Sequence, residues 1–152
     1  ESERIDVEAL LGQAAIANAK LAYRDFQRDF GGERFARLRG KGARVQRPLW
    51  GSTSTKNPAY RDVLYAEALI GPDTVDTMPD ATVEALLDHG IVEETITQDI
   101  PEAERFFDAL QEVGVDMDEV TSGLLADGVT AFADSFDSLI AHIEEKRAAV
   151  LR

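Results

Sequence analysis

The sequence lacks several features, and each absence excludes a kind of site. None of the 152 residues is a cysteine, so disulfides, thiolate metal sites and a cysteine nucleophile are excluded. The two histidines, His89 and His142, are far apart in the sequence, so we expect no metal site and no other cofactor. The longest apolar runs have only four or five residues, such as 14–17. We therefore expect neither a membrane-spanning helix nor a secretory signal.

Positive charge is scarce, and its distribution is uneven. The net charge is −13, so we do not expect nucleic acid as a partner of the whole chain. Residues 1–61 carry 12 Lys and Arg against 7 Asp and Glu, a balance of +5, whereas residues 62–152 carry a balance of −18. This asymmetry fits either a basic anion site beside an acidic surface or, as the simpler interpretation, ordinary solvated helices. An apolar fraction of 44% supports one folded domain.

The pattern of apolar residues predicts helices that alternate with two short strands. The strands are expected to end near Trp50 and to span 74–78. Helices are expected at 10–30, 33–39, 60–69, 80–87, 102–113, 117–126 and 129–150. In the last helix we expect a buried stripe made by Phe132, Phe136, Leu139, Ile140 and Ile143. Alternating strands and helices predict an α/β fold with parallel pairing, and two strands are too few for a complete domain of that class.

The loop at 51–58 carries most of the candidate chemistry. It offers short hydroxyl donors and one lysine, which are the groups that a phosphate monoester needs: Ser52, Thr53, Ser54, Thr55, Lys56 and Asn57. In α/β folds, ligands bind at the carboxyl ends of strands. A nucleotide P-loop would need glycine in place of Thr55 and a hydroxyl in place of Asn57. The loop therefore favours a sugar phosphate or another anion over ATP, unless it is a polar turn with a solvated lysine.

Other polar residues have a structural and a functional interpretation each. Lys20 could be a desolvated nucleophilic amine, but the edge of a packed helix face is the simpler assignment. Asp73 and Asp76 flank the second strand, where turn and cap roles are favoured over an acid–base pair. His89 suits a helix C-terminus better than catalysis. Trp50 is either a core residue or one wall of a pocket.

Two segments resemble a known family. The runs QRPLWGSTSTKNPAY at 46–60 and LIGPDTVDTMP at 69–79 closely resemble the longer bacterial transaldolases of the actinobacterial type. The same segment occurs in proteins that fuse a transaldolase to a glucose-6-phosphate isomerase. Residues 15–23 and 125–129 look like further family segments, so the resemblance covers nearly the whole chain.

The resemblance implies a fold and an activity. Transaldolases are (β/α)8 barrels of the TIM type, so residues 1–152 would be a single helix-rich segment with the last two strands of one barrel and without its N-terminal strands. The family is cytoplasmic and belongs to the pentose phosphate pathway. It transfers a dihydroxyacetone unit from sedoheptulose 7-phosphate to glyceraldehyde 3-phosphate through a lysine Schiff base, without metal or cofactor. The expected partners are sugar phosphates and the N-terminal part of the same protein.

The resemblance also implies roles for individual residues. Ser52 and Lys56 fall in the family segment that binds the substrate phosphate, and Thr53, Ser54, Thr55 and Asn57 lie in the same segment. Many family members have an arginine where this chain has Lys56, so the charge is kept and the bidentate fork is lost. No catalytic residue is expected in this chain, because the Schiff-base lysine lies upstream. The alternative is an inactive fragment, or a non-enzymatic module that binds an anion or a protein.

Overall fold

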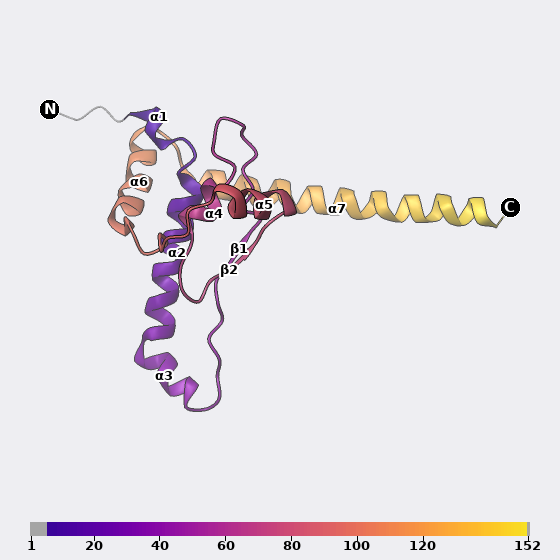
Figure 1. Cartoon of the computed structure of the whole chain (residues 1–152). Helices are drawn as coiled ribbons and strands as arrows, with labels where there is room; N and C mark the ends of the chain where they lie inside the picture. The colour runs from indigo at the N-terminus through magenta and orange to yellow at the C-terminus, as the bar shows by residue number, and fades with distance from the viewer. Residues whose placement is uncertain (1–5, 152) are drawn as a thin grey trace. The chain divides into compact units, whose positions relative to one another are not determined.

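The structure is a computed structural model that describes residues 6–151. The chain divides into two compact units, Glu1–Leu110 and Gln111–Arg152. Seven helices and two strands follow one another in the described part of the chain (Figure 1). They are α1 (Val7–Leu10), α2 (Ala14–Gly31), α3 (Glu33–Arg39), β1 (Leu49–Gly51), α4 (Leu64–Ala68), β2 (Val75–Thr77), α5 (Asp80–His89), α6 (Ile100–Glu112) and α7 (Met117–Val150).

The strand prediction is confirmed in position and direction. β1 and β2 form a two-stranded parallel sheet, in which Leu49 pairs with Val75, Trp50 with Asp76 and Gly51 with Thr77. The strands are only three residues long, so this small sheet depends on the helices for its stability. A helix-rich chain with one parallel pair is consistent with part of a barrel.

The core of the first unit joins α2 to the sheet and to the segment before α6. One cluster of its buried residues is made by Ile16, Ala19, Tyr23, Trp50, Leu69 and Ile96. A second, smaller cluster of Ala17, Ala103 and Phe106 joins α2 to α6. Trp50 is therefore a core residue, and its Nε1 has no hydrogen-bond partner among the described residues. A hydrogen bond from the Tyr23 hydroxyl to the carbonyl of Pro72 (3.0 Å) ties α2 to the turn before β2. The core thus fixes the sheet, and with it the loop after β1.

The opening helix begins later than the sequence predicted. The chain forms the short α1 and then a turn, and the long helix starts at Ala14 rather than near Leu10. Gly12 in this turn has φ = 77°, and a Cβ there would lie 3.1 Å from the ring of Tyr60. A left-handed backbone beside an aromatic ring favours glycine, so this residue interrupts the helix.

The prediction for the C-terminal part was wrong in two respects. We expected Gly128 to separate two helices, but α7 runs without a break from Met117 to Val150 (Figure 1). One glycine costs a helix only about 1 kcal/mol, and the surrounding alanines and leucines favour helix. Within the second unit no other element covers the expected apolar stripe, whose exposed fractions range from 40% at Ile140 to 83% at Phe132. A stripe is buried only where another element covers it.

No helix within residues 6–151 is both long and apolar enough to cross a membrane.

Candidate phosphate-binding loop

The loop begins where β1 ends, at the carboxyl end of the parallel pair. Ser52 is the first loop residue and has φ = 55°, so the chain turns sharply away from the strand. Its N–H donates to the Thr77 hydroxyl (3.3 Å), which in turn donates to the carbonyl of Trp50 (3.1 Å). The side chain of a β2 residue therefore holds the start of the loop in place.

Lys56 and Ser54 lie side by side in this loop. The Lys56 ammonium donates to the Ser54 Oγ (2.9 Å), and both groups are solvent-accessible. Because the serine oxygen accepts from the ammonium, the serine O–H can still donate to another acceptor. The ammonium keeps further N–H donors as well. A cation and a hydroxyl that donate from one place suit a phosphate oxygen.

Three other side chains of the predicted set are engaged within the protein. The Thr53 hydroxyl, which is buried, lies 3.1 Å from both oxygens of the Asp76 carboxylate. Thr55 donates its hydroxyl to the carbonyl of Arg61 (2.9 Å), and the Asn57 Oδ1 accepts from the N–H of Ala59 (3.0 Å). These contacts shape the loop. Of the remaining predicted residues, Ser52 and Lys56 are exposed and Ser54 is partly exposed.

Sequence reasoning missed the contact between Thr53 and Asp76. Burial raises the pKa of the Asp76 carboxyl, and the hydrogen bond from Thr53 opposes that shift. The Asp73 carboxylate is not paired with Asp76; it lies 3.8 Å from the Arg47 guanidinium, in a turn with φ = 59°. This agrees with the favoured turn role of Asp73. Only the strand register, which sets Asp76 beside Trp50, would have identified the partner of Thr53.

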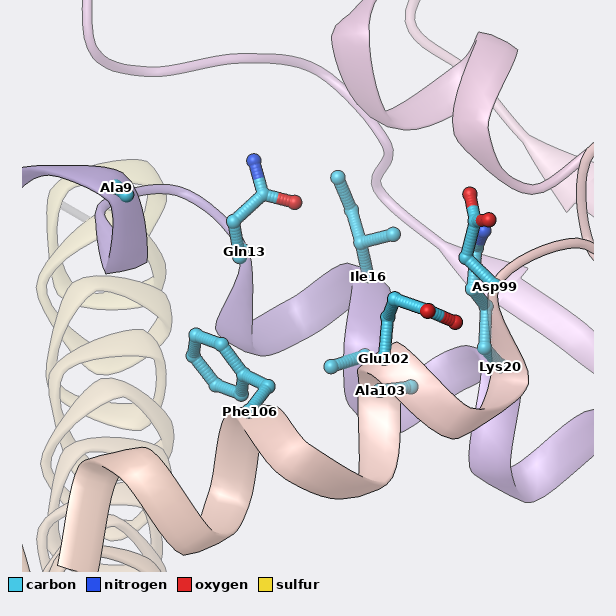
Figure 2. A pocket seen from close by; sticks show the side chains of 9 residues that line it. Ala9, Gln13, Ile16, Lys20, Asp99, Glu102, Ala103 and Phe106 are labelled. Carbon is cyan, nitrogen blue, oxygen red and sulfur yellow. The ribbon is translucent and has the colours of Figure 1, made fainter. Parts of the chain in front are cut away.

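A cavity lies between α2 and α6. It has a volume of about 330 Å³, with Gln13 and Phe106 at one end and Lys20 and Asp99 at the other (Figure 2). The Lys20 side chain is buried, and its ammonium donates to the carbonyl of Gln98 (2.9 Å). This bond connects α2 to the residue two positions before α6. Lys20 therefore has a structural role, but it is buried rather than at the edge of the helix face.

His89 ends α5 and forms two ion pairs. Its Nε2 lies 2.9 Å from Asp62 and its Nδ1 lies 3.1 Å from Asp88. The hydrogen bond with Asp62 is the largest cause that raises the pKa of His89, and the same bond lowers the pKa of Asp62. The histidine thus joins the end of α5 to the segment before α4, which is consistent with the structural role favoured for it.

The part of the chain that the structure describes contains no group of three or more His, Asp and Glu side chains able to hold a metal ion.

Comparison with known proteins identifies the family of this chain. The family model described as "Transaldolase/Fructose-6-phosphate aldolase" matches residues 2–143. The chain belongs to the transaldolase family. A transaldolase of Mycolicibacterium paratuberculosis is 48% identical over 140 residues, covering 91% of this chain and 38% of the relative. A transaldolase of Parafrankia is 49% identical over 140 residues, with the same coverage, and "Transaldolase 2" of Nostoc punctiforme is 44% identical over 142 residues.

The match covers only part of each relative. The chain spans only about two fifths of the length of these transaldolases. The resemblance to actinobacterial transaldolases is confirmed by the mycobacterial and Parafrankia relatives. The family implies a TIM-type barrel, and one parallel strand pair in a helix-rich chain is consistent with part of such a barrel.

Proposed function

We propose that this chain is the C-terminal part of a transaldolase barrel and that its loop after β1 binds the phosphate of a sugar-phosphate substrate. The complete protein would transfer a dihydroxyacetone unit from sedoheptulose 7-phosphate to glyceraldehyde 3-phosphate, in the pentose phosphate pathway of the cytoplasm. The main support is the contact between Lys56 and Ser54 at the carboxyl end of a parallel strand, in a chain that matches transaldolases.

The exposed face of the sheet supports the barrel part of this proposal. Leu49 and Val75 pair across the two strands and expose 57% and 40% of their surface, while Trp50 lies in the core. In a closed barrel, residues of alternate orientation face the interior and are packed by side chains from other strands. Two apolar residues on one sheet face fit such an interior, which strands outside this chain would complete.

In this proposal the chain supplies binding, and the remainder of the barrel supplies covalent catalysis. The Schiff-base lysine would lie in the N-terminal part, which is the partner of this chain, and no metal or cofactor would take part. The phosphate would accept hydrogen bonds from the Lys56 ammonium and from the hydroxyls of Ser54 and Ser52. Thr53, Thr55 and Asn57 would hold the loop in shape through their contacts with Asp76, Arg61 and Ala59.

The test uses a chimera in which the portion of the Mycolicibacterium paratuberculosis transaldolase outside the match completes this chain. Lys56→Ala should raise KM for the phosphorylated substrates about 10- to 150-fold, since a hydrogen bond to a charged group contributes about 1.5–3 kcal/mol. Lys41→Ala, which removes an exposed lysine outside the loop, is the matched control. Unchanged kinetics in Lys56→Ala would remove this residue from the phosphate site.

A trapping experiment tests the division of labour. Borohydride added with a ketose phosphate donor should fix an adduct on the chimera and none on residues 1–152 alone. An adduct on any lysine of this chain would contradict the placement of the nucleophile. Binding of phosphate by the chain without turnover in the chimera would instead support the non-enzymatic, anion-binding alternative.

A further inference from the structure

The excess of positive charge in the first part of the chain lies in one segment outside the loop after β1. Residues 33–47 carry six Lys and Arg against one Asp or Glu, a balance of +5. Residues 1–32 have a balance of −2 and residues 48–61 one of +2, so the segment accounts for the whole excess of residues 1–61. Like charges gathered in one place repel one another and attract anions. The segment is therefore a candidate anion site that the phosphate-binding loop does not explain.

Helix α3 places three of these cations around one hollow. Phe35 is buried and packs edge-on against Phe30 of α2, with 4.8 Å between the ring centres, which holds one side of α3 against the first unit. The hollow has a volume of about 610 Å³ and is lined by five residues: Arg34, Arg37, Leu38, Gly40 and Lys41. Ligand pockets ordinarily have volumes of about 300–1,000 Å³, so a small molecule fits this hollow.

The three cations of the hollow have no anionic partner within the described part of the chain. None of them pairs with a carboxylate of residues 6–151, and all three are exposed. By contrast, the guanidinium of Arg39 on the same helix lies over the Phe35 ring, 5.3 Å from its centre. The helix dipole favours cations only in the last turn, whereas Arg34 lies in the first turn and Lys41 beyond the end.

We propose that this hollow binds a compact oligophosphate, that is, a ligand with two or more phosphoryl groups. Guanidinium groups match phosphate oxygens in bidentate pairs, and an ammonium adds a point charge. Three cations nearly balance two phosphoryl groups, which together carry about three to four negative charges at pH 7. The connection from α3 enters β1 at its amino end, whereas the phosphate-binding loop follows its carboxyl end (Figure 1). The site is therefore separate from the loop and goes beyond the proposed function.

The composition of the chain favours a compact ligand over a nucleic acid. A nucleic acid gains affinity from many Lys and Arg contacts along its backbone, but this chain has 16 Lys and Arg against 29 Asp and Glu. An oligophosphate needs only the cations of one hollow. Leu38, which is 45% exposed, adds an apolar wall that a sugar or a base of the ligand would contact. Inorganic triphosphate, a nucleoside triphosphate and a sugar bisphosphate share the required chemistry.

Calorimetric titration of the chimera with tripolyphosphate tests the site. We expect saturable binding whose affinity falls at least tenfold in Arg37→Gln, because a charge-assisted hydrogen bond is lost. Arg39→Gln removes the same charge from the same helix and should lower the affinity less than about threefold, since only screened attraction is lost. Equal losses in the two variants would indicate general attraction to a basic surface and would overturn the proposal. So would binding that depends on Lys56 and not on Arg37.

Competition identifies the source of the phosphoryl groups. ATP and fructose 1,6-bisphosphate are each tested for displacement of tripolyphosphate from the chimera. Displacement by either one, with the same dependence on Arg37, would support the site and name its ligand class, whereas failure of both would assign the site to inorganic oligophosphate. A single-stranded RNA that binds more tightly than all three compact ligands, with the same dependence on Arg37, would overturn the proposal in favour of a nucleic-acid surface.

Lysine footprinting gives a second measurement that needs no variant. With tripolyphosphate at about ten times its Kd, acetylation of Lys41 should slow about tenfold, both in the chimera and in residues 1–152. Lys146, an exposed lysine of α7, is the control and should react at an unchanged rate. Protection of Lys56 without Lys41, or equal protection of Lys41 and Lys146, would overturn the proposal. So would protection of Lys41 in residues 1–152 alone, because the rest of the protein would then cover the hollow.

The outcomes separate this inference from the proposed function. Loss of oligophosphate binding in Arg37→Gln with unchanged transfer kinetics would support the separate site, and the kinetics of Lys56→Ala test the phosphate-binding loop independently. A chimera that transfers the dihydroxyacetone unit but shows no saturable binding dependent on Arg37 would keep the proposed function and overturn the oligophosphate site.

Discussion

Replacement of Lys20 by methionine tests how the helices of the first unit are joined. The Lys20 side chain is 8% exposed, and its ammonium donates to the carbonyl of Gln98 at 2.9 Å. Methionine keeps much of the apolar stem and removes the donor, so a carbonyl oxygen loses a charge-assisted hydrogen bond that contributes about 1.5–3 kcal/mol. Burial of a thioether costs less than burial of an ammonium, which offsets part of this loss. We therefore expect Lys20→Met to lower the free energy of unfolding by about 2 kcal/mol.

The chain carries a convenient probe for this measurement. Trp50 is the single tryptophan of the sequence and lies in the same core cluster as Ile16 and Ala19 of α2. Urea unfolding at pH 7, followed by its fluorescence, should show the midpoint lowered by about 1 M for a slope near 2 kcal/mol per molar. Lys41→Met, an exposed control, should change stability by less than about 0.5 kcal/mol. A Lys20→Met variant as stable as the wild type would show that the bond to Gln98 does not stabilise the unit.

Two further predictions concern the same unit. A Cβ at Gly71 would lie 2.1 Å from the Cγ2 of Ile96, so Gly71→Ala should lower the free energy of unfolding by about 1–3 kcal/mol in the wild type. The loss should be clearly smaller in an Ile96→Ala background. Additive losses in this double-mutant cycle would refute the clash. His89→Gln should lower the urea midpoint most at about pH 5.5, between the ordinary pKa values of 3.8 for Asp62 and 6.5 for His89. Asp62 raises the pKa of His89 in the folded protein, so the stabilisation by this ion pair is complete below the pKa of His89 in the unfolded chain. It is lost as pH rises through the pKa of His89 in the folded protein. A difference in urea midpoint between wild type and His89→Gln that grows toward pH 9 would therefore contradict the pairing.

Local patterns in the sequence identified the strands and the polar loop, and they did so for a physical reason. The apolar Trp50 and the polar residues directly after it predict the end of β1 from adjacent positions in the sequence alone, and the strand in the structure ends at Gly51. The contact between Thr53 and Asp76 spans 23 positions and depends on the register of two strands, which no local pattern encodes. Gly12, in the turn after α1, has φ = 77°, and a Cβ there would lie 3.1 Å from the ring of Tyr60, which is again a contact between residues far apart in the sequence.

The two exposed apolar faces of this chain support a single interpretation more strongly together than either does alone. Periodicity identified the apolar side of α7 correctly but could not show what covers it, since burial depends on a second element. In the first unit, Leu49 and Val75 likewise form an apolar pair on an uncovered sheet face. A complete soluble domain would bury both surfaces, whereas a segment of a barrel would leave an inner sheet face and an outer helix face to be covered by the rest. Within the first unit, the exposed pair of Leu49 and Val75 is therefore the physical observation that supports the proposal of a barrel completed by other strands.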